Sequence, residues 1–274
     1  MTSLFSLTEA CTGCGLCVAA CPASLVRQPA PGEPPQALAG REAHCIRCGH
    51  CVIACPTGAF VHSLLPPEAF EPVRRKDLPE FAALRHLLMS RRSCRVYDPK
   101  PLSREALLTL LEAVRHAPTG HNARDVGYVV VDGPARMDVV RQGVLDWMGA
   151  EVAADSARAR DLHLAGAARA AAKGKDVILR GAPHAVVIHA PKAGITPAED
   201  AIIAGAWLEI AAAAAGYGAC WCGYLGYALE GNPALGEMLG IPAGRQGYAA
   251  LLLGRPATRP RSIPPRDMPP VTFF

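Results

Sequence analysis

Apolar residues recur at helical spacing in two stretches that lie close together along the chain. Within 81–88, large apolar side chains occupy every third or fourth position, which predicts a helix. The same spacing within 107–114 predicts a second helix, and Ser103 shortly before it is a residue type that caps helix N-termini.

Short runs of β-branched and aliphatic residues predict buried strands between further helical stretches. The strands are predicted at 128–131, 185–188 and 247–254. Residues 135–180 are predicted to be mostly helical, and 199–215 to form an alanine-rich helix that Gly216 ends, because glycine commonly follows a helix C-terminus. Strands separated by helices predict an α/β or α+β layer with a central sheet flanked by helices.

The composition indicates a core built mainly from small and aliphatic side chains. Half of the 274 residues are hydrophobic and only 5% are aromatic, so alanine, leucine and valine must fill most of the core. The longest apolar run, 202–215, is interrupted by Glu209 and falls short of the roughly 18 residues that a membrane-spanning helix needs. We therefore expect a soluble protein with no membrane partner.

The positive charge is concentrated rather than spread along the chain. The formal net charge is +4, and the arginines gather in 85–95 and 255–266, which suits one specific anion better than a nucleic acid backbone. The first cluster contains Arg91, Arg92, Ser93 and Arg95. Guanidinium forks donate parallel charge-assisted hydrogen bonds, so this cluster suits a phosphate dianion. A solvated basic face is an equally weighted interpretation of the same run.

Eight of the eleven cysteines form two copies of one pattern, C-x2-C-x2-C-x3-C-P, spaced 34 residues apart. The first copy contains Cys11, Cys14, Cys17 and Cys21, and the second contains Cys45, Cys48, Cys51 and Cys55. Zinc knuckles use paired C-x2-C units and fit this pattern poorly. A disulfide framework is disfavoured because the first ten residues lack the features of a secretory signal. Free thiols indicate a reducing interior, so we expect a cytoplasmic protein.

The cysteine pattern resembles the bacterial-type 2[4Fe–4S] ferredoxin module, in which three thiolates of one copy and the last thiolate of the other bind each cluster. The resemblance implies one cluster on Cys11, Cys14, Cys17 and Cys55, and another on Cys45, Cys48, Cys51 and Cys21. It implies a ferredoxin-like domain over 1–64, which the proline-rich, charged stretch 65–78 links to the rest of the chain. The 23 residues between Cys21 and Cys45 predict a longer surface loop.

A second resemblance covers about residues 80–270. Ser-Arg-Arg-Ser-x-Arg-x-Tyr from Ser90, Ala-Pro-Thr-Gly-x-Asn from Ala117, a small-residue helix, Cys-Trp-Cys-Gly from Cys220 and an arginine-rich tail are similar to the nitroreductase family of FMN enzymes. Almost the whole chain therefore resembles ferredoxin–nitroreductase fusion proteins of bacteria and archaea. The resemblance implies an α+β fold class: a small ferredoxin-like domain joined to an α+β FMN-binding domain over 79–274, with a central sheet flanked by helices.

The same resemblance implies roles for particular residues around FMN. The phosphate and ribityl chain would be held by Arg91, Arg92, Ser93 and Arg95, with Arg259 or Arg261 completing the phosphate site. Cys222, Gly223 and Tyr224 would run beside the isoalloxazine ring, and Pro118, Thr119 and Asn122 would come from the partner subunit of a homodimer. The family often has Asn-x-Gln-Pro where this chain has Asn122-Ala123-Arg124-Asp125, so the flavin contact usually assigned to the Gln is not carried over to Arg124. Trp207 is predicted in the core or at the dimer interface.

The resemblances imply an FMN-dependent oxidoreductase that receives electrons through two [4Fe–4S] clusters and reduces a small nitroaromatic- or quinone-like acceptor. A reduced ferredoxin-type carrier or NAD(P)H would be the electron donor. The motifs demand no acid or base, so no catalytic residue is assigned. Two alternatives stay open: an NAD(P)H-dependent nitroreductase, which needs no Rossmann fingerprint, and an electron carrier or redox sensor without substrate turnover.

Overall fold

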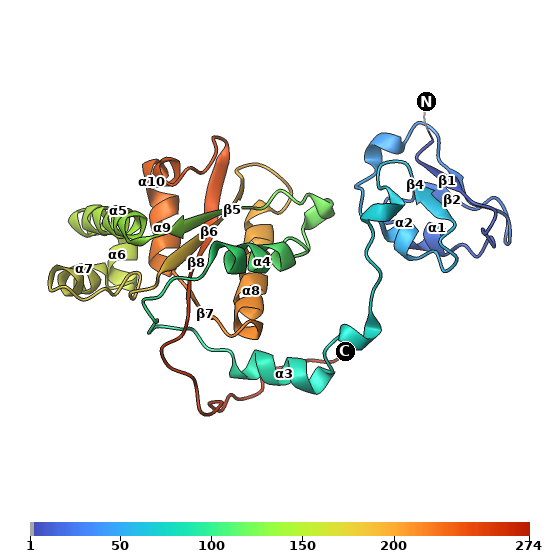
Figure 1. Ribbon diagram of the computed structural model, residues 1–274. Helices are drawn as coiled ribbons and strands as arrows, with labels where there is room; N and C mark the ends of the chain where they lie inside the picture. The colour runs from blue at the N-terminus through green and yellow to red at the C-terminus, as the bar shows by residue number, and fades with distance from the viewer. Residues whose placement is uncertain (1–2) are drawn as a thin grey trace. The chain divides into compact units, whose positions relative to one another are not determined.

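The computed structural model describes residues 3–274, which form two compact units (Figure 1). The first unit contains the residues up to Leu78 together with His121–Ala123, and the second contains Pro79–Gly120 and Arg124–Phe274. The predicted ferredoxin-like domain, 1–64, begins with two residues that lie outside the described part of the chain. Each unit has a hydrophobic core of its own.

The first unit is built from two small antiparallel ladders and two short helices. β1 (Phe5–Leu7) pairs with β4 (Phe60–His62), and β2 (Val26–Arg27) pairs with β3 (Gln36–Ala37). The helices are α1 (Leu16–Ala20) and α2 (His50–Ile53), and 3-10 turns lie at η1 (Glu42–His44), η2 (Pro67–Ala69) and η3 (Arg75–Asp77). In the core, Phe5 and Phe60 stack with ring centroids 4.2 Å apart. The β2–β3 ladder lies within the stretch that the sequence predicts as a surface loop.

The two cysteine motifs adopt the same backbone conformation. Gly15 and Gly49, 34 residues apart, both have φ of 74° and precede α1 and α2 as N-cap residues. Gly13 and Arg47 form a second such pair, with φ of 64° and 50°. Left-handed backbone carries little penalty for glycine, so Gly15 and Gly49 let each cysteine loop turn directly into its helix. The repeat in the sequence is therefore also a structural repeat.

The second unit is organised around an antiparallel sheet with the strand order β5-β6-β8-β7. Its strands are β5 (Gly127–Asp132), β6 (His184–Pro191), β7 (Gly218–Trp221) and β8 (Arg245–Gly254). Successive side chains of a strand point to opposite faces, so Val186 belongs to one hydrophobic cluster and Val187 to the other. Burial on both faces explains the continuous apolar runs of β6 and β8.

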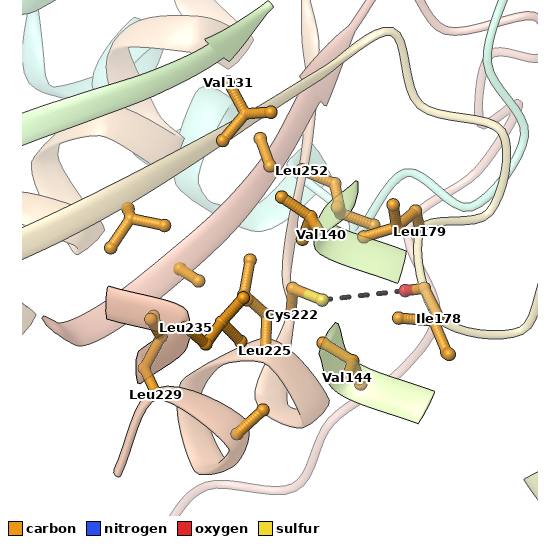
Figure 2. Close-up of a cluster of buried hydrophobic side chains, with 14 of the residues drawn as sticks. Val131, Val140, Val144, Ile178, Leu179, Cys222, Leu225, Leu229, Leu235 and Leu252 are labelled. Carbon is orange, nitrogen blue, oxygen red and sulfur yellow. Dashed lines mark hydrogen bonds between the residues drawn. The ribbon is translucent and has the colours of Figure 1, made fainter. Parts of the chain in front are cut away.

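Helices cover both faces of this sheet (Figure 1). The helices of this unit are α3 (Phe81–Ser90), α4 (Arg104–Val114), α5 (Pro134–Ala153), α6 (Ala157–Asp161), α7 (Leu164–Ala172), α8 (Pro197–Ala214), α9 (Gly223–Gly231) and α10 (Pro233–Met238), and a 3-10 turn, η4, lies at Gly120–Asn122. Of these helices, α3 buries no side chain and does not belong to either face of the sheet. Side chains of α4 and α8 pack on one face, and those of α5, α7 and α9 on the other. Figure 2 shows part of the hydrophobic cluster on the face covered by α5, α7 and α9, where Val140, Leu225 and Leu252 converge. The predicted α+β class is confirmed.

The predicted strands lie within β5, β6 and β8, and the predicted helix 199–215 corresponds to α8. Ser103 caps α4 as expected, since its side chain accepts the Ala106 N–H at 3.2 Å. Of the two positions predicted for Trp207, the core is excluded, because the residue is 43% exposed and α8 buries the face of Ala204 and Leu208; the dimer interface stays a prediction. The described residues contain no helix long and apolar enough to cross a bilayer.

Candidate functional site

The eight motif cysteines of the first unit surround two cavities. One cavity is lined by Cys11, Cys14, Cys17 and Cys55, and the other by Cys21, Cys45, Cys48 and Cys51. Each cavity thus receives three thiols from one motif and the last thiol of the other. This is the grouping that the ferredoxin resemblance implies, whereas the role of the thiols as cluster ligands stays a prediction.

The donor set and the backbone around these cavities fit iron–sulfur clusters. All eight thiols are free, and sulfur is the ligand that such clusters take from proteins. Among residues 3–274, no three His, Cys, Asp or Glu side chains are placed to hold one metal ion. The eight cysteines instead line two cavities, four around each. The Leu25 N–H donates to Cys21 Sγ at 3.3 Å, the kind of backbone contact that stabilises a thiolate.

Burial and hydrogen bonding affect these thiols differently. Burial raises the pKa of the Cys51 thiol to about 11 and also raises the pKa of Cys17. Burial opposes ionisation of Cys55 too, yet hydrogen bonds from the Thr57 hydroxyl and from backbone N–H groups lower its pKa overall. Burial, followed by the charge of Arg47, lowers the pKa of His62 beside the second cavity. Bound iron would keep all eight sulfurs as thiolates, because the metal binds the deprotonated form.

A larger cavity of about 820 Å³ lies in the second unit, where α3 ends. Its polar lining includes Arg91, Arg92, Ser93, Arg95, Glu209, Thr258 and Arg259. The segment after α3 is held as extended chain: the Cys94 N–H donates to the Ala219 carbonyl of β7 at 2.8 Å, and the Ala257 N–H donates to the Val96 carbonyl at 3.0 Å. These bonds bring together the two arginine clusters of the sequence. Arg261 is not part of this lining.

One carboxylate lies among these arginines. Glu209, whose side chain is 12% exposed, forms an ion pair with Arg91 at 2.7 Å and accepts the Trp221 indole N–H at 3.2 Å. Within the described chain, no ion pair involves Arg92, Arg95 or Arg259. The cavity therefore keeps a net positive charge, and Glu209 holds the Arg91 guanidinium in place at its wall.

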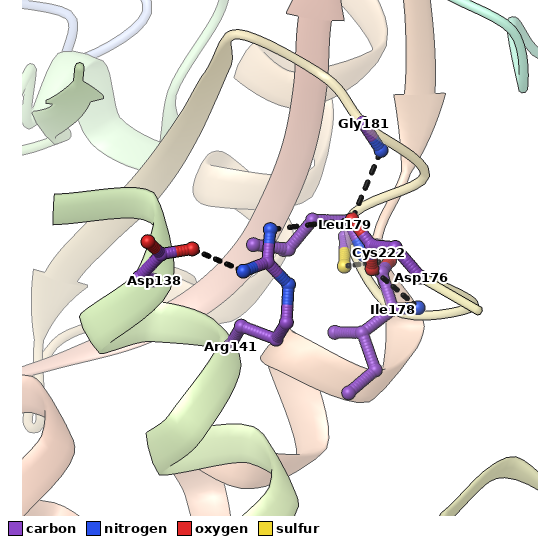
Figure 3. A network of polar contacts seen from close by, with 7 residues as sticks. All are labelled: Asp138, Arg141, Asp176, Ile178, Leu179, Gly181 and Cys222. Carbon is purple, nitrogen blue, oxygen red and sulfur yellow. Dashed lines mark hydrogen bonds and ion pairs between the residues drawn. The ribbon is translucent and has the colours of Figure 1, made fainter. Parts of the chain in front are cut away.

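A second cavity of about 240 Å³ in this unit is lined by Cys222, Gly223 and Tyr224, where α9 begins, and shares Arg95 with the larger one. The Cys222 thiol points into the core, 3.6 Å from the Ile178 carbonyl (Figures 2 and 3). Burial raises its pKa to about 12, so it stays protonated and serves packing. The rings of Tyr224 and Tyr227 also line this cavity.

Arg180 also lines the smaller cavity, and the sequence reasoning missed it. It has φ of 55° in a turn that Asp176 holds by accepting the N–H groups of Leu179 at 2.8 Å and Gly181 at 3.0 Å (Figure 3). Arg141 forms an ion pair with Asp176 at 3.4 Å from the other side. The turn has a local sequence signal that could have indicated it. Aspartate accepts hydrogen bonds from nearby backbone N–H groups, and Asp176 lies shortly before Gly181, a residue type that favours turns.

Replacing Asp176 with asparagine is expected to lower the free energy of unfolding of the second unit by about 2 kcal/mol, because a charged acceptor of several hydrogen bonds is lost. Burial alone would raise the pKa of Asp176, but backbone N–H groups and Arg141 lower it overall. The folded pKa thus lies below the unfolded one, so this stabilisation is complete above about pH 4 and disappears as the pH falls through the folded pKa. In Asp176→Asn, the free energy of unfolding should not show this decrease at low pH.

Urea unfolding followed by tryptophan fluorescence measures this, since all three tryptophans lie in the second unit. Asp138→Asn is the matched control, because Asp138 also contacts Arg141 but its side chain is 66% exposed. Asp138→Asn should change the free energy of unfolding by no more than about 0.5 kcal/mol. Equal losses of stability in the two variants would contradict the role assigned to Asp176.

The loop predicted to reach a partner subunit's flavin is held at the start of α8. The Gly120 N–H donates to the buried Asp200 carboxylate at 2.9 Å, and the Thr196 hydroxyl donates to the same oxygen at 3.0 Å. A Cβ at Gly120 would lie 1.9 Å from Thr196 Oγ1, so glycine is required there. Neither Pro118, Thr119 nor Asn122 lines the two cavities of the second unit. Their contact with a partner's flavin stays a prediction.

Thiol-lined cavities in one unit and an arginine-rich cavity beside a helix-flanked sheet in the other define an iron–sulfur oxidoreductase as the class of protein. Residues 10–60 match the 4Fe-4S dicluster domain, and residues 88–255 match the nitroreductase family. The second match covers more than half of the chain, which therefore belongs to the nitroreductase family. The predicted order of an iron–sulfur domain followed by a nitroreductase domain is confirmed.

Solved structures with similar folds include two bacterial nitroreductases with bound FMN. The one from Bacteroides fragilis is 22% identical, with a TM-score of 0.56 over 69% of this chain and 98% of its own. The one from Desulfitobacterium hafniense is 24% identical, with a TM-score of 0.54 over 69% and 96%. Oxidised iodotyrosine deiodinase bound to FMN and 3-iodo-L-tyrosine is 18% identical, with a TM-score of 0.55 over 70% and 98%. A search of curated protein sequences found no match.

Proposed function

We propose that this chain is an oxidoreductase that takes up electrons through two [4Fe–4S] clusters and passes them to FMN, which reduces a small nitroaromatic- or quinone-like acceptor. The observation that carries the proposal is the grouping of eight thiols into two sets of four around separate cavities. Such clusters carry single electrons, and flavin can accept electrons singly and deliver them in pairs. The donor in this proposal is a reduced ferredoxin-type carrier.

The residues of the second unit fit FMN. The larger cavity presents guanidinium groups of Arg91, Arg92 and Arg259 to a phosphate, and the Ser93 hydroxyl supplies a further hydrogen bond. The smaller cavity, which shares Arg95, offers the backbone of Gly223 and the ring of Tyr224 to a flat ring system. Arg95 and Arg180 place positive charge there, which favours the reduced flavin because reduction increases its negative charge.

The second subunit is part of the proposal. Pro118, Thr119 and Asn122 would complete the flavin pocket of the partner, which explains why they line neither cavity of their own chain. Trp207, 43% exposed on α8, is a large apolar side chain suited to such an interface. A homodimer with FMN at the interface is therefore the proposed assembly.

Anaerobic analysis of the purified native chain tests the cofactors. We expect about eight iron and eight sulfide per chain for two [4Fe–4S] clusters, with one FMN. The spectrum should show flavin bands over a broad iron–sulfur absorption. Flavin bands without that absorption would remove the iron–sulfur half of the proposal, and clusters without flavin would remove the other half.

Stopped-flow mixing of the same holoprotein tests the direction of electron flow. Reduced ferredoxin should bleach the clusters first and the flavin afterwards, because the clusters are the proposed entry point. Rapid flavin bleaching by NADPH together with slow bleaching by reduced ferredoxin would contradict the proposed donor and favour a conventional NAD(P)H nitroreductase.

A further inference from the structure

A buried histidine lines the second thiol-lined cavity, whereas the lining of the first contains no histidine. His62, at the end of β4, is 3% exposed and lines the cavity of Cys21, Cys45, Cys48 and Cys51. Its Nε2 lies 3.4 Å from Cys45 Sγ, a hydrogen-bonding distance for sulfur. A buried imidazole therefore contacts a proposed cluster ligand directly.

The other ring nitrogen sets the direction of this bond. The Leu64 N–H donates to His62 Nδ1 at 3.0 Å, so Nδ1 carries a lone pair and the ring proton is on Nε2. His62 consequently donates its Nε2–H to the sulfur of Cys45. The Ser63 N–H and hydroxyl both bond to the Leu4 carbonyl, at 2.9 and 2.7 Å, which ties this backbone to the residue before β1. The ring is thus held in a fixed orientation.

The repeat within the first unit provides an internal comparison. Gln28 occupies the position 34 residues before His62, and its amide donates to the backbone carbonyls of Gly13 and Glu33 instead of a sulfur. Gln28 does not line the first cavity. At the first cavity, the Thr57 hydroxyl lies 3.6 Å from Cys55 Sγ, and either atom can be the donor. The described residues therefore place an imidazole donor beside one cavity and a hydroxyl beside the other.

We propose that His62 raises the reduction potential of the cluster bound at the second cavity, so that the two clusters of one chain differ in potential. The inference rests on the proposed function, because it requires clusters at these thiols. Reduction adds one electron and breaks no bond, and it increases the negative charge on the thiolate ligands. An N–H aimed at Cys45 Sγ stabilises the reduced cluster more than the oxidised one, and exclusion of water strengthens the effect.

A redox titration of the whole chain with dithionite, followed by EPR, tests this role. In His62→Leu, one cluster potential is expected to fall by about 59 mV, a tenfold change in the one-electron equilibrium constant, while the other stays unchanged. His62→Gln keeps an N–H donor of similar length and should shift this potential by less. Thr57→Val is the matched control at the first cavity. It should leave the potential of the cluster at the second cavity at its native value.

The outcomes separate this inference from the proposed function. Two assembled clusters with unchanged potentials in His62→Leu overturn the inference alone, as does a shift of the same potential in Thr57→Val. Absence of iron and sulfide from the native chain overturns both. If His62→Leu fails to assemble clusters, the inference is tested on native protein with 15N-labelled histidine instead. Pulsed EPR of its reduced form should detect a histidine nitrogen coupled to a cluster, and the lack of any coupling rejects the inference.

Discussion

Replacing Cys55 with alanine is expected to remove the cluster of the first cavity, although Cys55 belongs to the second cysteine motif. Cys55 lines that cavity together with Cys11, Cys14 and Cys17. A [4Fe–4S] cluster takes one thiolate on each of its four irons, so the loss of one ligand should leave about half of the native iron and sulfide. Chemical analysis of the anaerobically purified variant, with EPR of its reduced form, measures this.

Double variants show which cysteines share a cluster. Cys55→Ala with Cys11→Ala should lose no more iron than Cys55→Ala alone, because both thiols serve one cavity. Cys55→Ala with Cys45→Ala should lose nearly all of it, because Cys45 lines the other cavity. Cys94→Ala is the control, since Cys94 lies in the second unit and its loss should not change the iron content. The opposite pattern would mean that each motif binds its own cluster.

Much of this first site could be predicted because its information is local. Cys11, Cys14 and Cys17 lie within seven residues, and Gly15 turns the loop directly into α1, so spacing alone fixes three neighbouring thiols. The placement of Cys55 beside them depends on contacts across the whole unit, including the β1–β4 ladder. Only the resemblance to two-cluster ferredoxins carried that part of the prediction.

The hydrogen bond of His62 could not be read from the sequence. It joins Cys45, the first residue of the second motif, to His62, which lies 17 positions further along and outside the motif, and it needs the Leu64 N–H to fix the ring proton. His62 carries no spacing signal, because it is the last residue of the short strand β4 and no other histidine or cysteine stands at ligand spacing from it. Its position became informative only when Gln28, its counterpart in the repeat, turned out to contact backbone instead of sulfur.

In the second unit, local patterns predicted the helices up to α8 and three strands but missed α9, α10 and the edge strand β7. Its four residues, Gly218–Trp221, are too few to show alternation, and they become a strand by pairing with β8. The Arg91–Glu209 ion pair could not be predicted either, because its two residues lie 118 positions apart and meet only in the folded chain. Glu209 looked like an interruption of an apolar helix, whereas the structure places it at the wall of the arginine-rich cavity.

Replacing Arg91 with alanine is expected to weaken FMN binding by about two to three orders of magnitude. The variant loses one guanidinium fork facing the proposed phosphate, and it leaves the Glu209 carboxylate, 12% exposed, without its ion-pair partner in the same cavity. Lost charge-assisted hydrogen bonds to the phosphate and repulsion of the phosphate by the unneutralised Glu209 carboxylate together cost about 3–4 kcal/mol of binding free energy, which corresponds to that loss of affinity. Titration of the flavin-free chain with FMN, followed by flavin fluorescence, measures the dissociation constant.

Riboflavin and a second variant separate the two parts of this effect. Riboflavin lacks the phosphate, so its affinity should change by no more than about threefold in Arg91→Ala, as hydrogen bonds to neutral groups contribute little net free energy. Adding Glu209→Gln removes the unpaired charge while keeping an acceptor for the Trp221 indole, so Arg91→Ala with Glu209→Gln should recover about tenfold of the FMN affinity. Equal losses for FMN and riboflavin, with no recovery in the double variant, would show that Arg91 supports the fold of the cavity rather than the phosphate of its ligand.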